Sequence, residues 1–222
     1  MIDPHVRRLR RLDACAVSDA LDKLGLQGTV TGLALRSGGA GAESRIAGRV
    51  VTMKVGPGVL PPGPLVHLGC GAIELAGPED VIVIEQRSGV DAGCWGGLLT
   101  LGAKARGVAG VIADGPVRDI DEAIALGFPI FSRALTAFTA RGRVVELGTQ
   151  VPVAIGDVRV EPSDYVIADR SAAVFVAAAD VARVLDAAES IAAREAAMAE
   201  AIRGGAPIGD VLGGAYERML DS

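Results

Sequence analysis

The alternation of apolar and polar positions predicts helices and strands in turn through the middle of the chain. Three stretches are apolar or valine-rich runs of strand length, as expected of strands buried in a sheet: residues 46–55, 80–85 and 108–113. Three others have the spacing and stop signals of helices: residues 12–24, 65–75 and 97–106. A Gly/Pro loop is expected at residues 56–63, and a turn at residues 114–117 leads into a helix that begins near Asp119.

The second half of the chain predicts short strands followed by helices. The strands are expected at residues 129–131, 151–155, 158–160, 165–168 and 173–176. A long alanine-rich helix follows over residues 180–202, and a second helical segment over residues 208–220. This order favours a compact layered α/β domain over a long doubly wound sheet. The terminal helix is a natural arm for packing against a neighbouring subunit.

Composition narrows the chemistry that the chain could perform. The sequence has 222 residues, one or at most two ordinary domains, and 50% of them are hydrophobic. It contains two histidines, His5 and His67, and three lysines. A histidine-rich zinc site is therefore disfavoured, and few lysines could form a Schiff base. Arginine, carboxylates, backbone amides and a hard metal ion remain the expected catalytic tools.

The charged and cysteine residues indicate a class of protein and a compartment. The formal net charge is −5, and the seven aromatic residues (Trp 1, Tyr 2, Phe 4) offer a poor stacking platform, so no nucleic-acid partner is expected. Three cysteines without paired spacing fit a reducing compartment. No signal peptide and no membrane-spanning run are expected. We therefore expect a cytoplasmic protein.

The first candidate site is the loop DGPVRD at residues 114–119, which follows an apolar strand and opens a helix. Arg118 has a planar fork suited to a carboxylate, and Asp119 is a hard oxygen ligand or a proton acceptor. The structural alternative is that Asp119 only caps the following helix, with Asp121 and Glu122 complementing the helix dipole. Spacing alone slightly favours that alternative.

The second candidate is the glycine-rich turn GCWGGLL at residues 93–99, which enters a helix. The free backbone N–H groups at such a helix start can bind a carboxylate, although a tight turn of small residues is the commoner case. This turn and the loop that ends in Arg118 and Asp119 follow successive strands. If those strands are parallel, both loops lie on the same edge of the sheet.

Other conspicuous residues are better explained without a site. The segment from His67 to Glu74 could be mistaken for a nucleotide or methyl-donor loop, but Ile73 stands near the place of its third glycine and no clear strand precedes it. A buried or interfacial thiol is the preferred interpretation of Cys94. Lys104 is expected to be a solvated helix lysine.

Taken together, the motifs resemble one known family. The segment GVAGVIADGPVRD at residues 107–119, followed by GFPIF at residues 127–131, is similar to the family of 4-hydroxy-4-methyl-2-oxoglutarate aldolases and the related regulator of ribonuclease activity A (RraA-like) proteins. SDALD at residues 18–22 and the closing strands near residues 151–169 resemble the same family. The likeness covers roughly residues 9–176, and its segments agree in order.

The resemblance implies a swivelling β/β/α fold, a layered sandwich of the phosphohistidine-domain type with a C-terminal helical arm. We expect one family domain over residues 1–176 and a helical extension over residues 177–222, part of the same unit and at a subunit interface. The resemblance further implies homotrimers or homohexamers. It implies a class II lyase that uses Mg²⁺ or Mn²⁺, cleaves a 4-hydroxy-2-oxo diacid to pyruvate, and often decarboxylates oxaloacetate.

The resemblance also implies roles for particular residues. Arg118 would bind the substrate's carbonyl or enolate oxygen, and Asp119 would hold the metal. The amides of the helix start at Gly97, Leu98 and Leu99 would bind the substrate carboxylate. Glu195, matched by approximate position, would reach the metal from the adjacent subunit.

One departure from the family pattern bears on activity. Aldolase members have an acidic residue twenty residues before the Arg-Asp pair, and here that position is Gly97. Decarboxylation is expected to survive this loss better than aldol cleavage, which also needs a base for the distal hydroxyl. Two other functions stay open: a non-catalytic regulator that binds a ribonuclease, and, less favoured, a methyltransferase. Fold resemblance alone does not decide among them.

Overall fold

The computed structural model describes residues 3–39, 44–59 and 66–217. Strands alternate with helices from Ile46 to Leu135, as the apolar runs predict. The strands are β1 (Thr29–Val30), β2 (Ala34–Ser37), β3 (Ile46–Gly56), β4 (Val81–Glu85), β5 (Gly110–Val117), β6 (Ile130–Leu135), β7 (Val145–Thr149), β8 (Val153–Ile155), β9 (Val158–Val160), β10 (Tyr165–Ala168) and β11 (Ala173–Val176). The helices are α1 (Pro4–Leu9), α2 (Ala14–Lys23), α3 (Cys70–Leu75), α4 (Gly97–Ala105), α5 (Ile120–Ala125), α6 (Val181–Arg203), α7 (Ile208–Val211) and α8 (Gly214–Glu217).

One long strand, β3, joins two parts of a curled sheet. Within the described residues the strand order is β1-β11-β10-β3-β4-β5-β6-β2, with β7 also paired to β3. The first half of β3 pairs antiparallel with β10, and the second half pairs parallel with β4. Strands β4, β5 and β6 continue the parallel part. The carboxyl ends of three neighbouring strands therefore share one edge.

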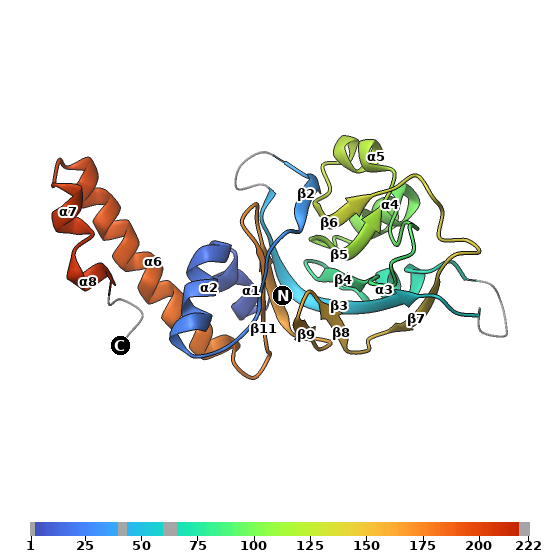
Figure 1. The fold of residues 1–222 in the computed structure, drawn as a ribbon, viewed down its shortest axis with the longest axis horizontal. Helices are drawn as coiled ribbons and strands as arrows, with labels where there is room; N and C mark the ends of the chain where they lie inside the picture. Colours follow the sequence, from blue (N-terminus) through green and yellow to red (C-terminus); the bar gives the residue numbers. More distant parts are fainter. Residues whose placement is uncertain (1–2, 40–43, 60–65, 218–222) are drawn as a thin grey trace.

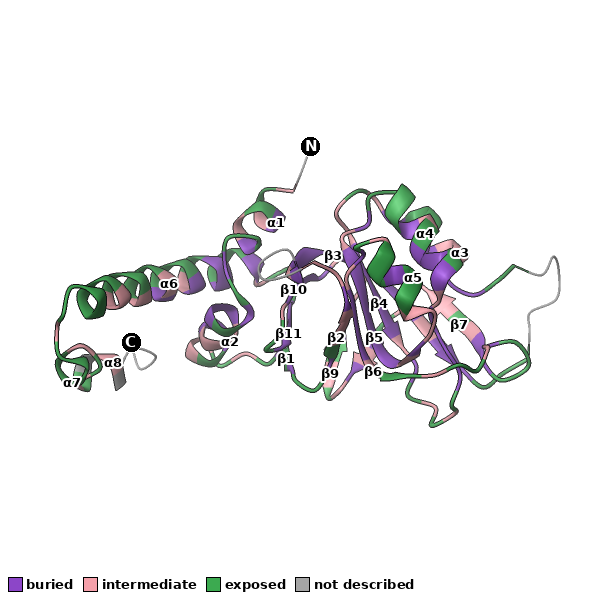
Figure 2. Ribbon diagram, turned by 90° about the horizontal axis from the view of Figure 1, so that it is seen from above, coloured by how far each residue is buried: buried purple, intermediate pink, exposed green. Residues whose placement is uncertain are grey.

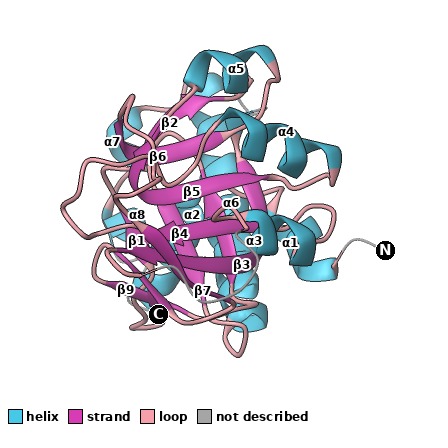
Figure 3. Cartoon of the chain, turned by 90° about the vertical axis from the view of Figure 1, so that its right-hand side faces the viewer, coloured by secondary structure: helices cyan, strands magenta, loops and turns pink. Residues whose placement is uncertain are grey.

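Apolar side chains on both faces of the strands explain the layered packing. In β4, Val81 and Val83 point into a cluster between the two parts of the sheet, whereas Ile82 and Ile84 face helices α3, α4 and α5. Strands β10 and β11 alternate in the same way between the central cluster and a second cluster under α1, α2 and α6. The result is a helix–sheet–sheet–helix sandwich, the layered α/β fold that the sequence predicts (Figures 1 and 3).

Helix α6 leaves the sandwich as an arm. Its first part is buried through Val184, Leu185, Ala188 and Ile191, where it packs on α2. Beyond Ile191 its residues are exposed or half-buried, and α7 and α8 lie at its far end (Figures 1 and 2). Among the described residues, no helix is both long enough and apolar enough to cross a membrane.

Several elements differ from the sequence predictions. The turn expected at residues 114–117 is wrong, because these residues continue β5 through an irregularity opposite β6. Strand β6 likewise runs beyond the expected end at residue 131. The expected helix over residues 65–75 begins only at Cys70, because residues 66–69 are not helical and end in a turn; residue 65 lies outside the described residues. The expected segment over residues 208–220 is two short helices, and residues 218–220 lie outside the described residues.

Candidate active site

The two candidate loops meet at the carboxyl edge of the parallel strands. Strands β4 and β5 are parallel in register from Val81 opposite Gly110 to Glu85 opposite Asp114. The turn before α4 and the Arg118-Asp119 pair therefore lie side by side, as the sequence predicts for parallel strands. This edge is where rigid strands position functional loops in α/β sheets.

Backbone hydrogen bonds fix the two loops against each other. The N–H of Cys94 donates to the carbonyl of Pro116 at 2.9 Å, and the N–H of Arg118 donates to the carbonyl of Trp95 at 3.0 Å. The Trp95 side chain is buried and donates through its indole N–H to Thr100. The loop before α4 is thus anchored both to the end of β5 and to its own helix.

Asp119 connects the two loops through its side chain. It adopts the left-handed backbone conformation (φ 57°, ψ 41°), which aspartate tolerates better than most residues. Its Oδ2 accepts a hydrogen bond from the N–H of Gly97 at 3.0 Å, and its Oδ1 accepts one from Arg118 Nε at 3.1 Å. As the structural alternative expects, Asp119 stands at the N-cap position of α5 and Asp121 and Glu122 lie in its first turn, but the Asp119 side chain makes no capping bond to that helix. The carboxylate serves the start of α4 instead.

Small residues at the start of α4 allow this close approach. A Cβ atom on Gly96 would lie 2.8 Å from Asp119 Oδ2 and 3.2 Å from Arg118 Cγ, both shorter than an ordinary contact. Beyond Gly97, the N–H groups of Leu98 and Leu99 belong to the first turn of α4 and have no protein acceptor among the described residues. Leu98 and Leu99 thus keep the free N–H groups that the sequence predicts at this helix start, whereas the Gly97 N–H is taken by Asp119; binding of an anion there stays a prediction.

Arg118 stands over this helix start with much of its guanidinium available. Its side chain is 34% exposed, and its only side-chain partner among the described residues is Asp119. Its stem lies against the glycines of the preceding turn, since a Cβ on Gly93 would be 3.0 Å from Arg118 Cγ. The Asp119 bond to Nε leaves the two terminal nitrogens of the guanidinium free to meet an oxygen of a ligand.

One acidic residue near this site was interpreted from the sequence only as a helix-dipole partner. Glu122 lies one helical turn after Asp119, and its carboxylate reaches the backbone of Gly97. A signal was present in the sequence, because residues three apart on a helix share a face. The spacing could not show that α5 packs against α4, which brings this face to the start of α4.

The remaining candidates of the central segment have structural roles. Cys94 is buried, and burial raises the pKa of its thiol to about 12, so it is no nucleophile at neutral pH. Lys104 lies on the exposed face of α4 and donates to the carbonyl of Leu126. Asp114 is buried and accepts hydrogen bonds from Arg133 Nε at 2.6 Å and from the N–H of Gly156 at 2.7 Å. It anchors the end of β5 to neighbouring segments.

Glu195 does not lie at this site within one chain. It is on α6, at the opposite end of the molecule from α5 (Figure 1). Burial, followed by the charges of Asp19 and Asp13, raises its pKa. A role for Glu195 beside Asp119 would therefore need a second copy of the chain, and it stays a prediction.

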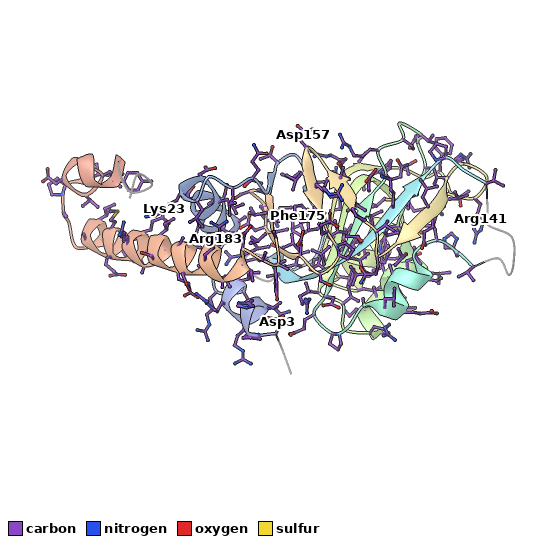
Figure 4. All side chains as sticks on the ribbon, turned by 90° about the horizontal axis from the view of Figure 1, so that it is seen from below. Asp3, Lys23, Arg141, Asp157, Phe175 and Arg183 are labelled. Carbon is purple, nitrogen blue, oxygen red and sulfur yellow. The ribbon has the colours of Figure 1, made fainter. Side chains whose placement is uncertain are left out.

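A hollow in the described part of the structure has neither Arg118 nor Asp119 in its lining. It is bounded by β7, by the turn around Arg141 and by His67 and Leu68. Figure 4 shows Arg141 at the sheet end of the molecule, far from Lys23 and Arg183 on the helical layer. Burial and the charge of Arg141 lower the pKa of His67. The hollow contains none of the predicted site residues.

Comparison with known proteins shows which family the chain matches. The RraA-like family (Aldolase/RraA) matches residues 14–175. A protein of Halalkalibacterium halodurans, which carries the provisional name 4-hydroxy-4-methyl-2-oxoglutarate aldolase, is 31% identical over 166 residues, covering 74% of this chain and 72% of its own. Two other curated relatives are matched over only 26% and 56% of their own lengths.

Solved structures agree with this match. An uncharacterized protein from Pseudomonas syringae pv. tomato superposes with a TM-score of 0.83 at 29% identity, over 95% of this chain and 98% of its own. Streptomyces coelicolor RraAS2, described as an unusual member of the RNase ES inhibitor RraA protein family, superposes with a TM-score of 0.74 at 26% identity, over 87% of this chain and 94% of its own. The family match spans most of the chain and includes both candidate loops. The chain belongs to the RraA-like family.

Proposed function

We propose that the protein is a class II lyase that cleaves a 4-hydroxy-2-oxo diacid to pyruvate and decarboxylates oxaloacetate. The observation that carries the proposal is the placement of Arg118 and Asp119 over the free amides at the start of α4. An arginine, a carboxylate and two amides at one point suit a small 2-oxo acid, because each recognises or balances negative oxygen. The aldolase name of the Halalkalibacterium halodurans relative supports the same reaction class.

The proposed substrate would bind with its carboxylate at the start of α4. Its carboxylate would accept hydrogen bonds from the N–H groups of Leu98 and Leu99, where the helix dipole also favours a negative charge. The terminal nitrogens of Arg118 would then donate to the neighbouring 2-oxo oxygen. Loss of carbon dioxide or breakage of the C3–C4 bond leaves negative charge on that oxygen as a pyruvate enolate. Arg118 stabilises the charge where it develops.

The Asp119 carboxylate suits a divalent metal ion. It offers hard oxygen donors, and no group of three or more His, Cys, Asp or Glu side chains able to hold a metal is found in the described part of the chain. Mg²⁺ is commonly bound through one or two carboxylates with water completing its shell, so this donor set fits Mg²⁺ or Mn²⁺. Asp119 would hold the ion. When bound, it would supply positive charge beside the developing enolate.

We also propose that the active unit is a homo-oligomer, a trimer or a hexamer. Leu98 is 85% exposed at the centre of the site, and Leu101 and Ile124 are exposed on the adjacent helices. Exposed large apolar residues that cluster beside a site are typical of surfaces covered by a partner. In such an assembly the helical arm at residues 177–222 would lie at a subunit interface and bring Glu195 of a neighbouring copy to the metal. We place the protein in the cytoplasm.

A pyruvate-release assay across a panel of 2-oxo diacids tests the lyase proposal. We expect pyruvate from oxaloacetate and from 4-hydroxy-4-methyl-2-oxoglutarate with Mg²⁺ or Mn²⁺, and none after EDTA treatment. Replacing Arg118 with alanine should lower the rate about 100- to 1000-fold, the usual cost of removing such an electrostatic group. A wild-type protein that releases no pyruvate from any member of the panel, with either metal, would refute the proposal.

The second candidate is a protein-binding regulator of a ribonuclease. It is favoured by the superposition on Streptomyces coelicolor RraAS2 and by the absence of an acidic side chain at Gly97. Stoichiometric binding of a ribonuclease by a chain without lyase activity would support it. The methyltransferase alternative has little support, because residues 67–69 belong to no strand and the rest of the segment to Glu74 lies in the short helix α3.

A further inference from the structure

The carboxylate of Glu122 occupies the space that a side chain at Gly97 would fill. A Cβ atom on Gly97 would lie 1.7 Å from Oε2 and 2.7 Å from Cδ of Glu122. Non-bonded heavy atoms are best separated by about 3.5–4.0 Å, so a side chain at position 97 would displace the end of the Glu122 side chain from the place it occupies here. Gly97 itself is buried, whereas Glu122 is exposed. The glycine therefore makes room for a carboxylate that comes from α5.

The Glu122 carboxylate is also unengaged. It makes no hydrogen bond and no ion pair with any other described residue, while the Asp119 carboxylate is bonded to Gly97 and Arg118. Asp119 uses one acceptor site on each of its oxygens, whereas neither oxygen of Glu122 has a partner among the described residues. A free carboxylate beside the start of α4 can accept a proton from a substrate bound there.

We propose that Glu122 is the catalytic base that takes the proton of the substrate's 4-hydroxyl group during aldol cleavage. This inference rests on the lyase function proposed above and deepens it. The two other candidate bases are poorly placed: Asp119 is already bonded, and Lys104 donates to the carbonyl of Leu126 on the exposed face of α4. Glu122 would supply the base that aldol cleavage needs for the distal hydroxyl and that Gly97 cannot provide.

Aldol cleavage breaks one O–H bond and one C–C bond of the substrate. Glu122 takes the hydrogen of the O–H group on C4, and that oxygen forms a double bond to C4 as the C3–C4 bond breaks. The electron pair of the broken bond forms the C2–C3 double bond of a pyruvate enolate, with its negative oxygen facing Arg118. The enolate then takes a proton from water at C3, and Glu122 returns its proton to solvent. The products are pyruvate and a second oxo acid.

Decarboxylation makes a different demand on the site. When oxaloacetate loses carbon dioxide, no O–H bond is broken, and only the enolate charge must be stabilised. Arg118 serves both reactions, whereas Glu122 serves aldol cleavage. The two reactions measured on the same protein therefore separate a failure of this inference from a failure of the proposed function.

The experiment compares four proteins with the wild type: Glu122→Gln, Asp121→Asn, Arg118→Ala and the double variant Gly97→Asp with Glu122→Ala. Asp121 is exposed in the same first turn of α5 and does not reach Gly97, so its variant is the matched control for charge on this helix. The double variant moves the carboxylate onto α4, into the space that the Glu122 side chain vacates. Pyruvate release is measured with Mg²⁺ from 4-hydroxy-4-methyl-2-oxoglutarate and from oxaloacetate.

We expect Glu122→Gln to lower the ratio of aldol cleavage to decarboxylation by about 100-fold or more, the usual contribution of a general base. Asp121→Asn should keep the wild-type ratio, and the double variant should recover part of the ratio that Glu122→Gln loses. Arg118→Ala should lower both activities. A merely structural Glu122 would lower both activities together and would not be rescued by a carboxylate at position 97.

Four results would overturn the inference. An unchanged ratio in Glu122→Gln would remove Glu122 from the reaction, and an equal fall in both activities would make its role structural. A wild type that decarboxylates oxaloacetate without cleaving the 4-hydroxy acid would refute the base while leaving the lyase site intact. A wild type with neither activity would refute the proposed function and the inference together.

Discussion

Replacing Asp119 by alanine, glycine or asparagine separates its backbone role from its chemical role. Its carboxylate accepts the Gly97 N–H at 3.0 Å, a helix-start bond whose loss costs about 1 kcal/mol of the free energy of unfolding. Alanine at φ 57° costs about 1 kcal/mol more than glycine there, because its Cβ is crowded in the left-handed conformation. The ion pair with Arg118 contributes little, since both side chains are about one third exposed.

The three variants are therefore expected to melt in a fixed order. Asp119→Ala loses about 2 kcal/mol, which lowers the Tm of a chain of this size by about 4–8 °C, and Asp119→Gly loses about half of that. Asp119→Asn keeps an acceptor oxygen and tolerates the backbone conformation, so its Tm stays near the wild-type value. All three should lose pyruvate release. Thermal unfolding by circular dichroism checks the order, and an alanine variant as stable as the glycine variant would refute the backbone argument.

Three further predictions concern the reactivity and stability contributions of Cys94, Glu195 and Asp114. Cys94 should resist alkylation near pH 8 in the folded protein and react after denaturation, because burial raises its thiol pKa to about 12; mass spectrometry reads this, and rapid native labelling would contradict it. Burial and the charge of Asp19 raise the pKa of Glu195, so stability falls as pH rises from the unfolded toward the folded pKa; Glu195→Gln should raise the Tm near pH 7 and not near pH 3, and equal shifts would count against it. Asp114→Asn, which weakens the bond from Arg133, should cost about 2 kcal/mol in urea unfolding, and a neutral result would show that the anchor is not needed.

The periodicity of the sequence predicts the parallel strands well, because buried runs such as residues 80–85 have no other plausible place. It misses the short strands β1, β2 and β7, whose two to five residues are held by pairing with distant strands and carry little local pattern. It also takes residues 114–117 for a turn. Glycine and proline usually mark a turn, but here pairing with β6 resumes after an irregularity and keeps the segment in the sheet.

The candidate site is predictable to the same extent. The positions of Arg118 and Asp119 follow from the strand order, because loops after parallel strands share an edge. The direction of the Asp119 carboxylate does not follow, since it depends on a left-handed backbone and on the packing of α5 against α4. The role of Gly97 also could not be predicted from the sequence. The sequence shows a missing acid, whereas the structure shows that Glu122 occupies its space.

Pyruvate release from oxaloacetate by wild type and by Arg118→Ala, each with Mg²⁺ and again with EDTA, tests the central claim most directly. We expect the wild type to release pyruvate with Mg²⁺ and to release none with EDTA. We expect the rate of pyruvate release by Arg118→Ala to be about 100- to 1000-fold lower than that of the wild type. A folded Arg118→Ala protein that releases pyruvate as fast as the wild type would contradict it.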